Sequence, residues 1–130
     1  MADILLVTLN ARYSHASLAL RWLKANLGEL EPRSEILEFV TGARTEAMAQ
    51  RILARRPRVV GFGVYIWNVD ETARLAAMLR AIDPSLKIVV GGPEVSHETD
   101  AQRICREADH VITGPGELAF AALCRQLLAG

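Results

Sequence analysis

Short apolar runs alternate along this chain with longer segments of helical period. Five runs rich in β-branched residues predict strands, which cover Asp3 to Leu9, Glu35 to Val40, Arg58 to Tyr65, Leu86 to Val90 and His110 to Thr113. The third and fourth runs, VVGFGVY and KIVV, are almost continuously apolar. Strands that are covered on both faces have this pattern, so the runs favour a parallel sheet between two layers of helices.

The intervening segments predict five helices, which cover Ala16 to Leu27, Thr45 to Arg55, Asp70 to Ile82, Thr99 to Glu107 and Glu117 to Leu128. Gly28 is positioned as a C-cap of the first helix, and Thr99 as the N-cap of the fourth. The inward positions expected from the apolar spacing are Leu18, Leu20, Trp22, Leu23, Leu27, Met48, Ile52, Leu53, Ala73, Leu75, Ala76, Leu79 and Ile104.

Five rounds of strand and helix predict parallel strands joined by right-handed crossovers. The expected fold class is therefore a flavodoxin-like (Rossmann-like) α/β three-layer sandwich, with a five-stranded parallel sheet in the order 2-1-3-4-5. A chain of 130 residues is expected to form one domain, residues 1–130. Because the chain stops directly after the fifth helix, we expect it to be the N-terminal part of a longer protein.

Composition narrows the possible partners. Fifteen Lys and Arg residues balance 15 Asp and Glu residues, whereas a general nucleic-acid binder shows a clustered basic excess. The amino terminus lacks the lysines of a signal peptide, and no apolar run approaches the roughly 18 residues of a membrane-spanning helix. The two cysteines, Cys105 and Cys124, fall in predicted helices and are expected to be reduced core residues. The sequence thus predicts no nucleic acid, no membrane and a cytoplasmic location.

Ligands bind open parallel sheets beyond the carboxyl ends of the strands, near the switch point between strands one and three. The candidate binding residues therefore follow the strands. They are Thr8, Asn10, Ala11, Arg12, Tyr13 and Ser14 after the first strand, Gly63, Tyr65, Ile66, Trp67 and Asn68 after the third, Gly91, Gly92, Pro93 and Glu94 after the fourth, and Gly114, Gly116 and Glu117 after the fifth.

The glycines of these loops have two interpretations. Gly91 and Gly92 either make a tight turn or allow a large flat ligand to approach the backbone, and Gly114 and Gly116 admit the same two explanations. Glu117 also fits an acid favoured in the first turn of a helix.

The aromatic and histidine residues are equally open. Tyr65 and Trp67 fit either the core or the lining of a pocket. His15 and His97 lack partners at metal-ligand spacing, so hydrogen bonding in loops is expected and no metal ligand is predicted.

Several familiar chemistries are excluded. Gly61-Phe62-Gly63 is followed by Ile66 where a dinucleotide fingerprint needs its third glycine, and there is no Walker lysine motif. A phospho-receiver domain needs acids after the first strand and an aspartate at the tip of the third, where this chain has Tyr65 and Ile66. No Ser-His-Asp or Cys-His constellation is supported, and two cysteines cannot hold a cubane cluster, which takes three or four thiolates.

Four stretches, ILLVTLNARYSHASLALRWLKANL, RVVGFGVYIWNVDET, KIVVGGPEVS and VITGPGE, together resemble the N-terminal cobalamin-binding domain of radical-SAM enzymes. The segment YSHASLAL is most similar to an uncharacterised branch of that family, and the anaerobic magnesium-protoporphyrin monomethyl ester cyclase is another relative. The resemblance implies a domain that holds cobalamin over the strand tips, with the nucleotide tail in a groove at the edge of the sheet.

The resemblance also implies a C-terminal radical-SAM barrel in the same parent chain. That barrel would carry a four-iron four-sulfur cluster and S-adenosylmethionine for methyl transfer, cyclisation or another radical step. The isolated domain is then expected to bind cobalamin without catalysing a reaction.

One motif of other cobalamin domains is missing. Methionine synthase and the mutases carry Asp-x-His-x-x-Gly after the first strand, and no spacing around His15 reproduces it. Gly63 also replaces a serine near the third strand. Many radical-SAM relatives lack the motif too and hold the corrinoid without a protein histidine on cobalt. The alternative is a docking or substrate-recognition domain that has lost cobalamin, while flavin mononucleotide is disfavoured because the first loop lacks a serine- and glycine-rich phosphate cradle.

The resemblance further implies residue roles. Hydrogen bonds to corrin amides or phosphate would come from Thr8, Asn10, Tyr13 and Ser14, and Arg12 would pair with the phosphate. Gly91 and Gly92 would open the tail groove, and Tyr65 with Trp67 would pack against the macrocycle.

Overall fold

The computed structural model describes residues 2–11, 18–65, 68–92, 103–113 and 116–129. Its strands are β1 (Ile4–Asn10), β2 (Ser34–Val40), β3 (Val59–Gly63), β4 (Lys87–Gly91) and β5 (His110–Ile112). Its helices are α1 (Leu18–Ala25), the 3₁₀ helix η1 (Gly28–Arg33), α2 (Thr45–Leu53), α3 (Val69–Ile82), α4 (Arg103–Glu107) and α5 (Glu117–Ala129).

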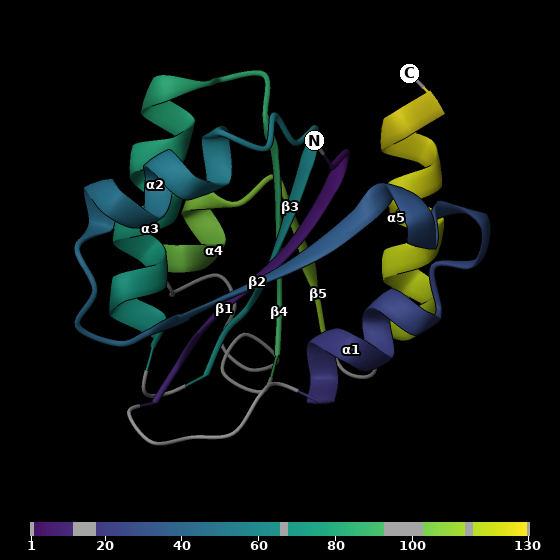
Figure 1. The fold of residues 1–130 in the computed structure, drawn as a ribbon, viewed down its shortest axis with the longest axis horizontal. Coiled ribbons are helices and arrows are strands. Elements are labelled where there is room, and N and C mark those ends of the chain that lie inside the picture. The colour runs from purple at the N-terminus through teal and green to yellow at the C-terminus, as the bar shows by residue number, and fades with distance from the viewer. Residues whose placement is uncertain (1, 12–17, 66–67, 93–102, 114–115, 130) are drawn as a thin grey trace.

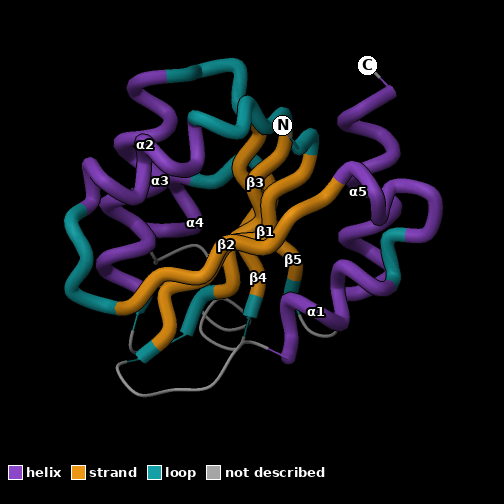
Figure 2. Tube along the Cα trace, viewed as in Figure 1, coloured by secondary structure: helices purple, strands orange, loops and turns teal. Residues whose placement is uncertain are grey.

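The five strands form one parallel sheet in the order β2-β1-β3-β4-β5, which confirms the predicted flavodoxin-like topology. The helices form two layers, with α1 and α5 on one side of the sheet and α2, α3 and α4 on the other (Figure 1). The tube in Figure 2 shows the strands between these layers. We call the side of the sheet under α1 and α5 the open face, and the side under α2, α3 and α4 the closed face.

Each face has its own apolar core. The closed face is packed by alternate strand residues such as Val60, Phe62 and Ile88 together with Leu75 and Leu79 of α3. The open face is packed by the intervening strand residues, among them Leu6 and Val89, together with residues of α1 and α5. Both faces of the sheet are therefore covered, as the continuous apolar runs predict.

Strand β3 begins one residue later than predicted and ends two residues earlier, at Gly63 rather than Tyr65. The amide of Tyr65 donates to Asn68 Oδ1 (2.8 Å) instead of a neighbouring strand. The side chain of Asn68 thus bends the chain out of the sheet, which an apolar pattern alone does not reveal.

Helix α2 ends at Leu53, earlier than the predicted Arg55. The amide of Arg56 donates to Leu53 O (3.0 Å), and Arg56 has a φ of 51°. The chain therefore turns through the left-handed region before it reaches Pro57. Helix α4 is described from Arg103 on, so its predicted N-cap Thr99 lies outside the described residues, but Ile104 is buried as expected.

The described part of α1 confirms Leu20 and Leu27 as core residues, while Leu23 is half-buried. The inward placement of Trp22 was wrong, because its side chain is 59% exposed. Trp22 follows Leu20 by two residues, about 200° around a helix of 3.6 residues per turn, and therefore faces solvent. Gly28 adopts a φ of 61° as a C-cap requires, but it also begins η1, a helix that the sequence did not predict.

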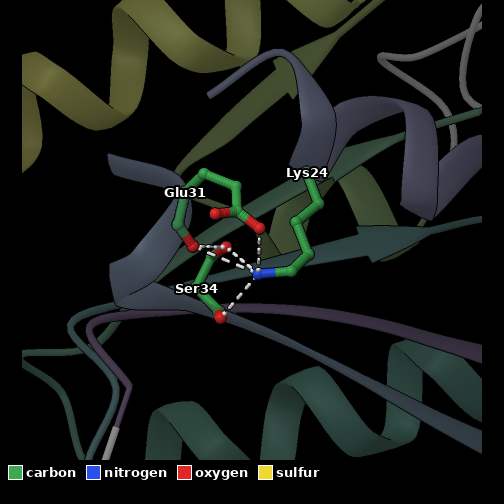
Figure 3. Close-up of polar contacts among 3 residues, drawn as sticks. All are labelled: Lys24, Glu31 and Ser34. Atoms are coloured by element: carbon green, nitrogen blue, oxygen red, sulfur yellow. Dashed lines mark hydrogen bonds and ion pairs between the residues drawn. The ribbon is translucent and has the colours of Figure 1, made fainter. Parts of the chain in front are cut away.

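The end of α1 is fixed by the ammonium group of Lys24 (Figure 3). Its Nζ donates to Ser34 O (2.9 Å), Ser34 Oγ (2.8 Å) and Glu31 O (3.1 Å), and pairs with Glu31 Oε1 at 3.2 Å. One side chain thus joins α1, η1 and the first residue of β2. This junction sets the position of α1 over the open face.

Neither cysteine forms a disulfide, as expected. Cys124 is buried under the open face, and burial raises the pKa of its thiol to about 12, so it is a protonated core residue at neutral pH. Cys105 is only half-buried and packs against the core of the closed face. Within the described residues, no helix combines the length and the apolar character needed to cross a membrane.

Candidate ligand cavity at the carboxyl edge of the sheet

A cavity of about 150 Å³ lies between the open face of the sheet and helices α1 and α5. It sits at the carboxyl ends of β3 and β4, where ligands of parallel α/β sheets bind. Its lining residues are Leu6, Leu20, Leu23, Gly61, Phe62, Gly63, Val89, Val90, Gly91, Gly92, Ile112, Gly116 and Phe120. Every side chain in this set is apolar, and five of the residues are glycines.

The cavity owes its space to two neighbouring glycines of the sheet. In register, Gly63 of β3 lies beside Gly91 of β4, and Gly91 lies beside Ile112 of β5. A Cβ at Gly63 would meet Thr8 Oγ1 and Tyr65 Cε2 at 3.5 Å, and a Cβ at Gly91 would meet Ile112 O at 3.5 Å. These are ordinary contacts, so the fold itself tolerates a side chain at either position. The absence of a side chain at Gly63 and Gly91 therefore creates the space of the cavity and is not required by the backbone conformation.

Gly92 is a different case. Its φ is 118°, and a Cβ there would lie 2.4 Å from the carbonyl oxygen of Val64. Only glycine fits this conformation and this close approach. Of the two explanations for the glycine pair, the turn explains Gly92, and the open space explains Gly91.

Gly61 lies deeper in the cavity and touches α5. A Cβ at Gly61 would meet Cε1 and Cζ of Phe120 at 3.0 Å. The Phe120 ring thus packs directly on the backbone of β3 and closes the inner end of the cavity.

The ends of β1 and β3 are joined by a buried polar bracket of Thr8 and Asn68, which are each 1% exposed. Asn68 Nδ2 donates to Leu9 O (3.0 Å) and Gly63 O (3.2 Å), and it lies 3.4 Å from Thr8 Oγ1. Thr8 Oγ1 donates to Gly63 O at 3.1 Å. Asn68 Oδ1 also accepts from the amide of Tyr65. Both side chains therefore have protein partners, and their geometry gives them a structural function at the switch point.

Asn10 lies at the same edge, beside β2. Its Nδ2 donates to Glu38 Oε1 (3.2 Å), and Arg21 of α1 donates to Glu38 Oε2 (3.0 Å). This bridge ties α1, whose Leu20 and Leu23 form one wall of the cavity, to the sheet. Asn10 therefore helps to position that wall.

Among the other predicted site residues, Tyr65 is half-buried and its ring lies against Gly63 at the cavity. Gly116 lines the cavity, and Glu117 starts α5 in a half-buried position. Ala11 is half-buried directly after β1. Eight predicted site residues lie outside the described residues: Arg12, Tyr13, Ser14, Ile66, Trp67, Pro93, Glu94 and Gly114.

Sequence analysis missed the apolar walls of the cavity. Leu6, Val89 and Phe120 were not among the candidate binding residues, because nothing in their residue type distinguishes them from ordinary core residues. The usable signal was the alternation within VVGFGV, which places Val59, Gly61 and Gly63 on one face of the strand and larger residues on the other.

Among the described residues, no three His, Cys, Asp or Glu side chains come close enough to form a metal site. The edge of the sheet thus provides an apolar cavity with polar groups that brace its rim. Such a site suits an uncharged flat ring far better than a phosphate or a hard cation.

A family model described as the B12 binding domain matches residues 4–124. No curated protein is significantly similar to the chain in sequence.

Three solved structures show the fold. A novel cobalamin-binding protein from Desulfitobacterium hafniense DCB-2 matches with a TM-score of 0.70 and 19% identity, over 97% of this chain and 58% of that protein. The cobalamin-dependent S-adenosylmethionine radical enzyme OxsB matches with a TM-score of 0.68 and 17% identity, over 97% of this chain and 18% of that enzyme. The BeF₃-activated DrrB receiver domain matches over all of both chains with a TM-score of 0.66 and 15% identity. At these identities, the likeness establishes the shared fold, which also occurs in receiver domains.

Proposed function

Because the chain belongs to the B12-binding domain family, we propose that it is the cobalamin-binding domain of a radical-SAM enzyme. It would hold the corrinoid over the carboxyl ends of the strands, with the nucleotide tail in the glycine-opened cavity, and without a histidine from an Asp-x-His-x-x-Gly motif. The observation that carries the proposal is the space beside Gly63 and Gly91, which the fold does not require.

The cavity fits the ring of the tail. Apolar cavities of about 150 Å³ lined by Leu, Ile and Phe stay dry and bind an aromatic ring. The cavity here has this volume, and its lining is likewise apolar, with glycine and Val beside Leu, Ile and Phe. The cavity is also partly open, so a ring inside it can remain attached to a larger group outside.

Different residues of the site would contact different parts of the ligand. Leu20, Leu23 and Phe120 would enclose the tail base, and Gly63 with Gly91 would let it lie against the sheet. Tyr65, which is half-buried with its ring near Gly63, would pack beside the macrocycle. When bound, cobalamin supplies a cobalt centre that can carry a methyl group for a neighbouring catalytic domain.

The catalytic steps belong to that second domain. The chain corresponds to only 18% of OxsB, whose name describes a radical enzyme that depends on both cobalamin and S-adenosylmethionine. We propose that a C-terminal radical-SAM barrel in the same parent chain, with a four-iron four-sulfur cluster, uses the bound corrinoid. The domain itself would then bind the corrinoid and position it for the barrel.

Titration with hydroxocobalamin tests binding directly. We expect saturable retention of the pigment, with a change of its visible spectrum as the base leaves cobalt. Absence of both at high micromolar concentration would refute the proposal for this domain and leave the alternative, a docking or substrate-recognition domain that has lost cobalamin.

A variant locates the site. Gly91→Val should weaken retention at least tenfold, because its side chain fills the space beside Ile112 while its Cβ makes only ordinary contacts. Gly42→Ala is the matched control, since Gly42 has a φ of 93° and lies outside the cavity. The control should lose stability but keep its affinity, and equal affinity of Gly91→Val and the native chain would move the site elsewhere.

A further inference from the structure

We propose that the cavity selects corrinoids whose lower base is a benzimidazole over corrinoids whose lower base is a purine. This inference rests on the proposed function and adds a specificity to it. It comes from the hydrogen-bonding state of the cavity walls rather than from their shape.

No side chain among the described lining residues offers a polar atom. The described side-chain walls are Leu6, Leu20, Leu23, Val89, Ile112 and Phe120, while Phe62 and Val90, whose side chains pack on the closed face, and the five glycines contribute backbone. Hence a polar substituent on a buried base would have to find its partner on the backbone.

Three carbonyl groups of the lining glycines already accept hydrogen bonds from the protein. Gly63 O accepts from Thr8 Oγ1 (3.1 Å) and Asn68 Nδ2 (3.2 Å), which uses both of its lone pairs. Gly91 O accepts from Val64 N at 2.8 Å, and Gly116 O accepts from Phe120 N at 2.8 Å. The polar bracket thus uses both lone pairs of Gly63 O, and one lone pair each of Gly91 O and Gly116 O is used by the end of β3 and the first turn of α5.

The two classes of base differ in what they need. A dimethylbenzimidazole presents C–H and methyl edges, which match an apolar wall. A purine such as adenine carries an exocyclic amine and additional ring nitrogens, which lose their hydrogen bonds to water on burial. An unsatisfied buried donor or acceptor is penalised strongly, so we expect at least a tenfold preference for the benzimidazole.

The test compares affinities for three probes by ultrafiltration and absorbance. The probes are dicyanocobalamin, the dicyano form of the adenine-containing cobamide, and dicyanocobinamide, which has no nucleotide base. Cyanide occupies both axial positions of cobalt in each probe, so the differing strength of base coordination does not enter. We expect cobalamin to bind at least tenfold more tightly than the adenine form.

The outcomes are separable. If cobalamin and the adenine form bind within threefold of one another, the selectivity is refuted while the binding function stands. If neither is retained, the proposed function fails. If cobinamide binds as tightly as cobalamin, the tail does not use the cavity and the selectivity is refuted as well.

A substitution in the cavity wall tests whether the preference for the benzimidazole base arises there. Val89 is 2% exposed and lines it, so Val89→Thr keeps the shape and adds a hydroxyl that can accept from an amine. The preference should fall at least threefold. Val60→Thr makes the same change on the closed face and should leave the preference unchanged.

An unchanged preference in Val89→Thr would overturn the assignment to the cavity wall. Ile112→Thr, at a half-buried position of the same lining, gives a second reading if Val89→Thr does not fold.

Discussion

The two faces of the sheet are built from alternate residues of the same strands, yet only one of them is filled. In β3, the closed face carries Val60 and Phe62, while the open face carries Gly61 and Gly63. Helices α2, α3 and α4 cover the closed face, whereas α1 and α5 cover the open face around a cavity (Figure 1). A single strand can thus serve stability on one side and binding on the other, because its side chains alternate between faces.

We expect the largest effect from a core residue of the closed face. It tests whether this face contributes more to the free energy of unfolding than the open face does. Leu79 is fully buried in α3, so Leu79→Ala should lower the free energy of unfolding by about 2–5 kcal/mol. Leu23→Ala, at a half-buried wall of the cavity, should lower it by less, about 1 kcal/mol. Urea unfolding followed by circular dichroism measures both, and similar losses would mean that the two faces contribute alike.

The second prediction separates the adjacent glycines of the open face. Gly92→Ala forces a Cβ towards Val64 O at a φ of 118° and should cost about 1–3 kcal/mol of stability. Gly91→Ala makes only ordinary contacts and should change stability by less than about 0.5 kcal/mol. Thermal or urea unfolding reports the difference, and an equal loss would show that both glycines serve the turn.

The third prediction concerns charge beside the closed face. Burial opposes the charged form of Asp109, but hydrogen bonds from Arg80 and the Ile88 amide, and the nearby charges of Arg80 and Lys87, outweigh it and lower the pKa of the carboxyl below 3.8. The folded state therefore binds protons less readily than the unfolded state. This contribution is present above the unfolded pKa and is lost as the pH falls through the lower, folded value.

Asp109→Asn should accordingly reduce stability at pH 7 by about 1 kcal/mol or less, given the partial exposure of the pair. The difference from the native chain should shrink as the pH drops below 3.8. Urea unfolding at a series of pH values measures it. A difference that stays constant through that range would exclude the carboxylate as its source.

The smallest effect tests the connection from α2 to β3. Arg56 has a φ of 51°, whereas Gly28, Gly42 and Gly92 supply the other left-handed residues in the described ranges. Arg56→Gly should raise stability by about 0.5–1 kcal/mol, because the left-handed conformation costs an L-residue more than glycine. Arg56→Ala is the control and should give no gain by the same unfolding assay.

The topology was predictable from sequence because five apolar runs alternate with five helical segments, and parallel crossovers leave few arrangements. Trp22 was misplaced because apolar residues two positions apart look continuous in sequence but lie on different sides of a helix. The end of β3 was misplaced because Asn68 draws the amide of Tyr65 out of the sheet, and Asn68 is itself held by Leu9 O and Thr8 Oγ1, 59 and 60 positions away. Such long-range polar pairing leaves no local periodic signal.

The site was predictable in position but not in composition. The rule for parallel sheets pointed to the strand ends, and Gly63, Gly91, Gly92 and Gly116 do line the cavity. The assignment of Thr8, Asn10 and Asn68 to ligand binding stays a prediction, and the structure gives each of them protein partners. Sequence cannot distinguish a polar residue that awaits a ligand from one that braces the backbone.

The bracket of Thr8 and Asn68 has a consequence for engineering. The hydrogen bonds of these two side chains join the ends of β1 and β3 directly at the switch point. The loops after the strands should therefore be exchangeable as cassettes between related domains, provided that Thr8, Gly63 and Asn68 are retained. The carboxyl edge of this sheet could therefore accept loops with a different binding specificity.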